Sequence, residues 1–347
     1  STDGTDLAAK LQELFQVLNT ASGNRFKNLD EQLAEFPYVN GRLFEEPLPT
    51  ASFDSRMRQA LLNCCYMDWS RISPAIFGSM FQSVMNPKER RNLGAHYTSE
   101  KNILKLIKPL FLDELWAEFE KAKTNTNALR KLHNKISRLR FLDPACGCGN
   151  FLIIAYRELR LLEIEILKLL LKGQTVTDIG SYILLDVDKF YGIEYEEFPA
   201  QIAQVAMWLA DHQMNMLAGE AFGEYYVRLP LRKSATIVHG NALRCDWQDL
   251  LQPQLSDLWN KENSDALRFD YIMGNPPFVG KHLQNAEQKA DMELIFQGVN
   301  GAGVLDYVAA WYIKAAQYMS VDPDSKTKTA FVSTNSISQG EQVGILW

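Results

Sequence analysis

Residues 139–151 read LRFLDPACGCGNF, and this stretch decides the fold that we expect for the chain. A short apolar run ends in an aspartate, a turn with two glycines follows, and a long apolar segment comes next. This order predicts a strand at Leu139–Leu142 and a helix that begins at Phe151 and ends near Gly173. Glycines in such a turn let a ligand approach the backbone, and the helix offers unpaired N–H groups. Taken alone, the turn is also compatible with a tight connection that binds nothing.

Four other short runs of strand-forming residues lie further along the chain, and two of them are followed directly by glycine. They are Phe190–Ile193, Thr236–His239, Tyr271–Met273 and Thr329–Ser333. A second helix is expected to start just after Pro199, because proline is favoured at the first position of a helix. The alternation of strands and helices predicts an α/β fold over residues 91–347, with a doubly wound, mostly parallel, Rossmann-like sheet.

The first 90 residues show a different pattern. Apolar residues recur at helical spacing at Leu7, Leu11 and Leu14, and again from Met57 to Met67. We therefore expect residues 1–90 to form an N-terminal helical module that packs on the α/β domain.

Composition limits the class of protein. The chain has 347 residues, of which 46% are hydrophobic and 22% charged, as in an ordinary globular protein. No uncharged apolar segment reaches bilayer length and no secretion signal is recognisable, so we expect a cytoplasmic protein without membrane contact. The five cysteines are an odd number without paired zinc-ligand spacing, which predicts reduced thiols and no metal site. The net charge of −6 argues against nucleic-acid binding by bulk electrostatics.

The predicted strand at Tyr271–Met273 is followed by Gly-Asn-Pro-Pro-Phe. Consecutive prolines stop the strand and fix an extended turn. The side-chain oxygen of Asn275 and the carbonyl of Pro276 can then accept both hydrogens of an amino group that attacks an electrophilic methyl group. Phe278 would stack on a base pulled out of a duplex. The alternative, a turn whose aromatic residue belongs to the core, is less favoured because the glycine-rich turn lies at the same edge of the sheet.

A dinucleotide site is the first competing interpretation of the glycine-rich turn. The third glycine of that motif is replaced by Leu152, and no acidic residue follows at the usual distance. Glu194, at the end of the second predicted strand, is placed to accept hydrogen bonds from both ribose hydroxyls of any adenosine cofactor. The sequence thus disfavours nicotinamide and permits adenosine.

Several motifs in this order resemble the class I, amino-directed DNA methyltransferases, and the resemblance covers roughly residues 90 to 340. It implies the cofactor S-adenosylmethionine and methylation of the N6 amino group of adenine, flipped out of duplex DNA. The motif Gly94-Ala95-His96-Tyr97-Thr98 is similar to the family's N-terminal cofactor motif, which implies that Tyr97 and Thr98 contact the methionine part.

The resemblance implies further site residues. Those expected to bind the cofactor in the glycine-rich motif are Asp143, Pro144, Ala145, Gly147, Gly149, Asn150 and Phe151. Glu194 is expected at the ribose, and Asn241 and Ala242 at the adenine, although the family more often has aspartate at the position of Asn241. The catalytic motif is expected to be Asn275, Pro276, Pro277 and Phe278, with Phe278 where tyrosine is commoner, and Asn275 is also expected to contact the cofactor. The segments Asp306-Tyr307 and Asn335-Ser336 are similar to the next two motifs.

More narrowly, residues 68–78 and Gly280-Lys281 resemble the MmeI-like type IIG restriction-modification enzymes. In this family an endonuclease, a helical connector, a methyltransferase and a target-recognition domain share one polypeptide. The resemblance implies that residues 1–90 are the connector and that a target-recognition domain, with most of the DNA contacts, lies outside these 347 residues. An N-terminal nuclease domain is a further expected partner, whereas the Glu287-Gln288-Lys289 spacing is better interpreted as a solvated surface than as a nuclease site.

Two alternatives remain open. The same fold and cofactor could serve another nitrogen, either cytosine N4 or a protein glutamine. The chain could also be a non-catalytic module that binds the cofactor and signals to another domain.

Overall fold

The computed structural model describes residues 2–36, 38, 51–69, 72–76, 78, 80, 98–174, 176, 178–223, 234–251, 267–322 and 324–347. Within these residues one sheet of five parallel strands forms the centre of the molecule, in the order β3-β2-β1-β4-β5. The strands are β1 (Phe141–Asp143), β2 (Phe190–Glu194), β3 (Thr236–His239), β4 (Tyr271–Gly274) and β5 (Lys328–Phe331).

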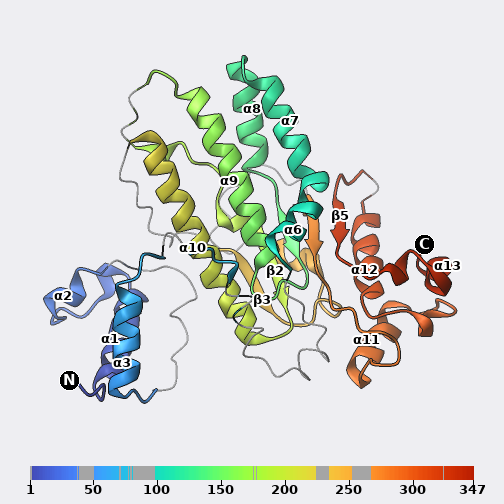
Figure 1. Ribbon diagram of the computed structural model, residues 1–347, viewed down its shortest axis with the longest axis horizontal. Helices are drawn as coiled ribbons and strands as arrows, with labels where there is room; N and C mark the ends of the chain where they lie inside the picture. The colour runs from blue at the N-terminus through green and yellow to red at the C-terminus, as the bar shows by residue number, and fades with distance from the viewer. Residues whose placement is uncertain are drawn as a thin grey trace.

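Figure 1 shows the described N-terminal helices at one end of the long axis and the C-terminus at the opposite end. The N-terminal helices are α1 (Leu7–Leu18), α2 (Glu31–Ala34) and α3 (Ser55–Cys65). Those before and between the strands are α6 (Glu100–Ile107), α7 (Asp113–Ala122), α8 (Thr126–Ile136), α9 (Asn150–Leu170) and α10 (Glu197–Phe222). Three more follow β4: α11 (Ala286–Ile295), α12 (Ala309–Ser320) and α13 (Val343–Leu346).

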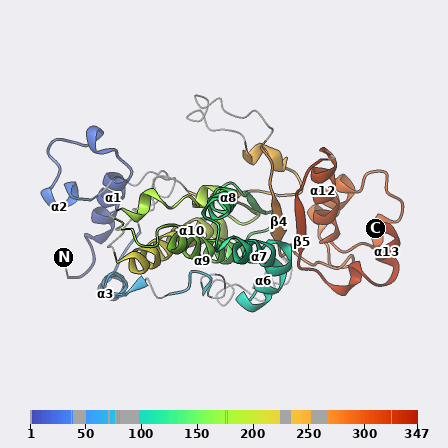
Figure 2. The same ribbon diagram turned by 90° about the horizontal axis from the view of Figure 1, so that it is seen from above.

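Helices cover both faces of the sheet, since successive strand residues point to opposite faces. On one face Phe141 stacks on Phe190 and on Tyr271, with ring centroids 4.9 Å and 5.3 Å apart. This aromatic row packs against α6, α8, α9 and α10. Leu142 and Ile272 belong to the other core, which α11 and α12 complete. Figure 2 shows α12 beyond β4 and β5, away from α9 and α10. The predicted doubly wound α/β fold is confirmed.

A buried polar network joins α8, α9 and α10. Arg160 of α9 is fully buried; it pairs with Glu163 (3.2 Å) and donates to Asn215 of α10 (2.9 Å). Nε2 of His133, on α8, lies 2.9 Å from the second oxygen of Glu163. Removal of one member would leave a buried charge unmatched, which costs about 3–5 kcal/mol. The network therefore fixes the helix that begins at the glycine-rich turn.

The structure corrects several predicted boundaries. The helix predicted after the glycine-rich turn is α9, which begins at Asn150 and ends at Leu170. The ends of β1 and β5 differ from the predicted ends by one or two residues. The helix expected just after Pro199 begins at Glu197, so this proline lies within its first turn, where no N–H is needed.

A larger correction concerns the segment before β1. Strand–helix alternation was expected from about residue 91, but residues 100–136 form α6, one π-helical turn at Lys108–Leu112, α7 and α8. The aromatic and leucine side chains of this segment cover the sheet instead of joining it.

The N-terminal helices match the predicted helical pattern, but few of their apolar residues are buried. Val17 is buried in α1, whereas α3 contains no buried residue. The expected boundary near residue 90 lies outside the described residues. Among the described helices, none combines the length and the low polarity that a bilayer span requires.

Candidate functional site

Three predicted site residues lie at one edge of the sheet, where neighbouring parallel strands end. Asp143 ends β1, Glu194 ends β2 and Asn275 follows β4, and β1 pairs with both β2 and β4. Ligands of open α/β sheets bind at this edge. The structure therefore brings together the glycine-rich turn, the predicted ribose acid and the Asn-Pro-Pro-Phe turn.

In the glycine-rich turn between β1 and α9, one glycine has free space beside it and the other is in close contact with a neighbouring helix. Both have left-handed backbone angles, with φ of 54° at Gly147 and 85° at Gly149. A Cβ atom on Gly149 would lie 3.1 Å from Cβ of Ala203 in α10, so this glycine permits close packing of the helices. A Cβ on Gly147 would meet no atom within 4 Å. The space beside Gly147 is what a ligand needs in order to lie against the backbone.

Asp143 is fully buried. Its Oδ1 accepts a hydrogen bond from the backbone N–H of Ala145 (3.0 Å), whereas Oδ2 is buried and has no hydrogen-bond partner in the described part of the chain. Burial, together with the nearby carboxylate of Glu194, raises the pKa of Asp143 to about 8. A buried oxygen of this kind is suited to a polar or cationic group of a ligand.

Glu194 is held by the backbone on both oxygens. The N–H of Gly147 donates to Oε2 (2.8 Å), and the N–H of Glu196 donates to Oε1 (3.0 Å). Burial raises the pKa of this carboxyl, and the two backbone hydrogen bonds oppose the rise. Each oxygen keeps a second lone pair, so the arrangement allows a pair of hydroxyl donors to bind.

The turn after β4 lies against Asp143 and contacts Thr98, the described residue of the predicted N-terminal cofactor motif. A Cβ on Gly274 would overlap the Asp143 carboxylate, so only glycine fits between the two turns. Nδ2 of Asn275 donates to Oγ1 of Thr98 (2.8 Å). Pro276 is buried, whereas Phe278 is partly exposed. The hydrogen bond to Thr98 fixes the amide plane of Asn275 and turns its oxygen to the opposite side.

Asn241 lies just beyond β3, and both ends of its amide are engaged within the protein. Its Oδ1 accepts from the N–H of Leu243 (2.9 Å), and its Nδ2 donates to Asp291 of α11 (2.9 Å). Asp291 also accepts from Tyr307 (2.7 Å) and from Arg244 (2.6 Å). Asp291 lies in no recognisable motif, because no local signal distinguishes one acidic residue on a polar helix.

The other predicted site residues differ in how exposed they are. Pro144 is buried and Ala145 partly exposed, and Ala242 is buried with its carbonyl accepting from Trp247 (2.9 Å). Phe151 is 3% exposed in the core, which leaves its backbone as the part within reach of a ligand. Tyr97, like Gly94–His96, lies outside the described residues.

Asn150 begins α9 and meets the N-terminal part of the chain. Its Oδ1 is buried without a hydrogen-bond partner among the described residues. A Cβ on Gly78 would lie 2.6 Å from its Nδ2, so Gly78 packs directly on this side chain. The described residues contain no group of three or more His, Cys, Asp or Glu side chains placed to hold a metal ion.

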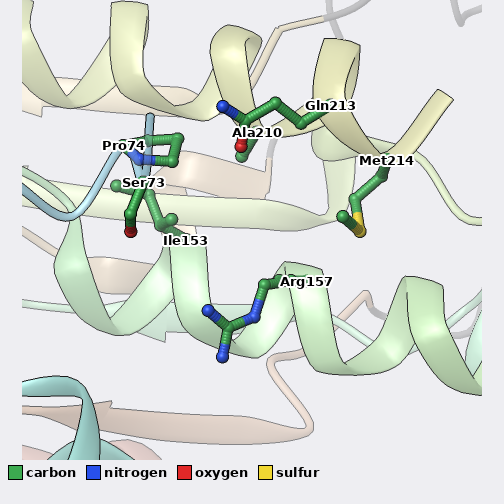
Figure 3. A pocket seen from close by; sticks show the side chains of 7 residues that line it. All are labelled: Ser73, Pro74, Ile153, Arg157, Ala210, Gln213 and Met214. Atoms are coloured by element: carbon green, nitrogen blue, oxygen red, sulfur yellow. The ribbon is translucent and has the colours of Figure 1, made fainter. Parts of the chain in front are cut away.

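A pocket of about 180 Å³ lies away from this edge. Figure 3 shows its lining residues, which come from the segment before residue 80 and from α9 and α10. They are Ser73, Pro74, Ile153, Arg157, Ala210, Gln213 and Met214. Gln213 donates to the carbonyls of Trp69 (2.9 Å) and Ile72 (2.6 Å). The pocket thus marks where the N-terminal segment docks on the α/β domain.

The fold and the two turns at its ligand edge define the class as a Rossmann-like protein of the methyltransferase type. Residues 119–347 match the family model described as the DNA-methyltransferase domain of MmeI, and residues 1–44 match the model of the MmeI helicase spacer domain. The chain belongs to the MmeI DNA-methyltransferase-domain family. This match confirms the resemblance inferred from the motifs.

Two similar proteins support the assignment. DNA methyltransferase A of Bacillus subtilis (strain 168) is 41% identical over 350 residues, which include 99% of this chain and 37% of that protein. The solved structure of the type IIL restriction-modification enzyme MmeI in complex with DNA is 59% identical, with a TM-score of 0.90. That alignment covers 100% of this chain and 44% of the MmeI chain. The chain thus spans less than half the length of either relative.

Proposed function

We propose that this chain transfers a methyl group from S-adenosylmethionine to the N6 amino group of adenine in duplex DNA, as part of a restriction-modification protein. The observation that carries the proposal is the hydrogen bond between Asn275 and Thr98, immediately beside Asp143. This hydrogen bond joins the predicted catalytic turn to the predicted cofactor site, and both lie at the same edge of the sheet.

The residues of the β1 and β2 ends fit such a cofactor. The cofactor supplies an electrophilic methyl group on a positively charged sulfur. The open space at Gly147 gives access to the backbone, and the buried Oδ2 of Asp143 offers an acceptor for a positively charged group. Glu194 has lone pairs for two ribose hydroxyls, while its backbone hydrogen bonds keep it in place.

The residues after β4 position the acceptor. Asn275 accepts one hydrogen of the adenine amino group on its side-chain oxygen, and Pro276 accepts the other on its carbonyl. These two bonds concentrate the nitrogen lone pair toward the methyl group. Phe278 stacks on the flipped base, because every base has a π-face that an aromatic ring can hold. The excess proton leaves after transfer, so no strong base is required.

The proposal includes the partners expected from the sequence. The solved structure of the similar MmeI in complex with DNA supports DNA as the substrate, which we propose to be a duplex. We propose that a target-recognition domain supplies most DNA contacts, because the net charge of this chain is −6. We also propose that residues 1–90 connect the domain covering residues 91–347 to a nuclease domain, and that the protein acts in the cytoplasm.

The central test is Asn275→Ala in the full-length protein, with methyl transfer followed in a single turnover and cofactor binding measured by calorimetry. Transfer should fall at least about 100-fold, the typical cost of removing one transition-state hydrogen bond. The dissociation constant for the cofactor should stay within about threefold of its original value, less than 1 kcal/mol.

The matched control is Asn134→Ala, which changes an exposed asparagine on α8. Identification of the methylated nucleoside after digestion tests the acceptor. Methyl groups on cytosine or on a protein glutamine would refute adenine N6 while leaving the cofactor assignment intact. Equal loss of binding and transfer in Asn275→Ala would contradict the division of roles between the two turns.

A further inference from the structure

Asp291 on α11 belongs to no motif considered above, yet it is one of the most buried acidic residues at the ligand edge. It is 2% exposed and accepts hydrogen bonds from Asn241 (2.9 Å), Tyr307 (2.7 Å) and Arg244 (2.6 Å). A buried carboxylate needs such donors, and every one of them comes from a segment at this edge or behind it. The carboxylate therefore has a defined position relative to Asn241.

The position of Asn241 makes this contact relevant to a ligand. Gly240 donates its N–H to the carbonyl of Glu194 (2.8 Å), so Asn241 follows directly beside the proposed ribose acid. An amide side chain has two orientations with opposite polarity. A carboxylate can only accept, so Asp291 requires the NH₂ group of Asn241 on its side. The oxygen of Asn241 then faces the N–H of Leu243 (2.9 Å), and its second lone pair can accept a further hydrogen bond.

Helix α11 is attached to both ends of the site. Its first turn is closed by a capping box between Asn285 and Gln288. Just before it, Gln284 donates to the carbonyls of Val279 (3.4 Å) and Leu305 (3.1 Å), which ties the helix to the turn after β4. At the other end of the site, the hydroxyl of Tyr195, the residue after Glu194, donates to Glu287 of the helix (3.0 Å). The helix thus holds Asp291 at a fixed distance from both turns.

We propose that Asp291 is a positioning residue for the adenine end of the cofactor. By fixing the amide of Asn241, it directs the Asn241 oxygen to the 6-amino group of the adenine. The pair Asn241–Asp291 then provides the acceptor that a single aspartate provides where the family has aspartate at this position. This inference rests on the proposed function, because it requires an adenosine cofactor.

If Asn241 and Asp291 act as a pair, a substitution of one should require a matching substitution of the other. In wild type, Nδ2 of Asn241 lies 2.9 Å from an oxygen of Asp291. Asn241→Asp alone would replace this nitrogen with a carboxylate oxygen, and repulsion between the two carboxylates would displace one of them. The double variant Asn241→Asp/Asp291→Asn reverses donor and acceptor. In it, the new amide at position 291 donates to the new carboxylate at position 241, the hydroxyl of Tyr307 accepts, and Arg244 keeps an oxygen partner.

The experiment measures binding of S-adenosylhomocysteine and of its inosine counterpart, in which a carbonyl replaces the amino group, by calorimetry. The wild-type chain should prefer the adenosine form by about tenfold, roughly one hydrogen bond. Asn241→Asp should weaken binding of the adenosine form about tenfold, and the double variant should recover it to within about threefold. Asp291→Ala should reduce the preference between the two ligands and leave the affinity for the inosine form nearly unchanged.

Thermal unfolding of each variant shows that it is folded, and the single and double Asn241 variants decide the question if Asp291→Ala does not fold. Equal loss of both ligands in Asp291→Ala, or no recovery in the double variant, would reduce Asp291 to a structural residue and overturn the inference. A wild-type chain that binds both ligands equally overturns this inference alone. A wild-type chain that binds neither overturns the proposed cofactor as well.

Discussion

The turn after β1 and the turn after β4 lie side by side, but they are built differently. In the first, the backbone N–H of Gly147 donates to Glu194, which is 47 residues away and on the neighbouring strand. In the second, the amide of Asn275 is oriented by a side chain, Thr98, which is 177 residues away. The contact between Gly147 and Glu194 thus forms within one strand–helix–strand unit, whereas the proposed acceptor turn is oriented by a residue that lies far from its own strand in sequence.

The largest effect is expected at the contact between the two turns. Gly274→Ala would force its Cβ into the Asp143 carboxylate, so both turns would move. A displacement of this kind typically costs about 100-fold in turnover. Methyl transfer and cofactor affinity, measured on the same preparation, should both fall.

Gly280→Ala is the matched control, because its Cβ would meet Oδ1 of Asp306 at an ordinary 3.6 Å. It lies on the other side of the Asn-Pro-Pro-Phe turn and should change neither quantity by more than about threefold. If Gly274→Ala reduced transfer while leaving cofactor affinity intact, the two turns would be independent and the close contact would have no functional role.

A second prediction concerns Asp143, which belongs to the glycine-rich turn. Its pKa of about 8 means that the free chain holds it mostly protonated at neutral pH. A positively charged ligand binds the ionised form better, so a proton must leave when binding occurs below this pKa. Affinity for S-adenosylmethionine should therefore rise by up to about 25-fold from about pH 6.5 to about pH 8.5, in proportion to the ionised fraction of Asp143, and then level off.

The same raised pKa has the opposite effect on the stability of the free chain. The contribution of Asp143 is fully present below its unfolded pKa of 3.8 and is lost as the pH rises through about 8. Asp143→Asn should flatten both profiles, which calorimetry and urea unfolding at several pH values would show. A pH-dependent affinity that persists in Asp143→Asn would assign the proton to another group.

The smallest effect is expected at the long-range contact. Thr98→Ala removes the hydroxyl that accepts from Asn275 and should reduce methyl transfer about fivefold, close to 1 kcal/mol for one hydrogen bond. Cofactor binding should change less. Thr98→Ser keeps the hydroxyl and should retain most of the rate in a single-turnover assay. Equal rates for the alanine and serine variants would show that the hydroxyl does not orient Asn275.

The sequence predicted the features whose signals are local. Short apolar runs located all five strands to within two residues, because a parallel strand and its turn are encoded within about ten residues. The glycine-rich turn and Glu194 also came from such signals, and the structure places them together. The contacts of Asn241 did not, since Asp291 lies 50 residues further on.

Two other failures have a related cause. The apolar segment that predicted α9 gives no sign of a polar network, yet Arg160 and Glu163 are fully buried in this helix. Their partners on α8 and α10 lie far apart in sequence, so no local pattern shows that these charges are matched. Similarly, residues 100–136 precede the first predicted strand and form helices that cover the sheet, an arrangement that only the tertiary structure determines.

The 177-residue separation between Thr98 and Asn275 also bears on the order in which the molecule acquires its properties as it folds. Closing a long loop costs more chain entropy than closing a short one, and contacts between distant residues slow the search for the native state. The hydrogen bond from Gly147 to Glu194 can form once β1, α9 and β2 have assembled. The amide of Asn275 gains its orientation only after β4 has joined the sheet and the segment at residue 98 has returned to it. During refolding, the ability to bind the proposed cofactor should therefore appear before the ability to hold the proposed base.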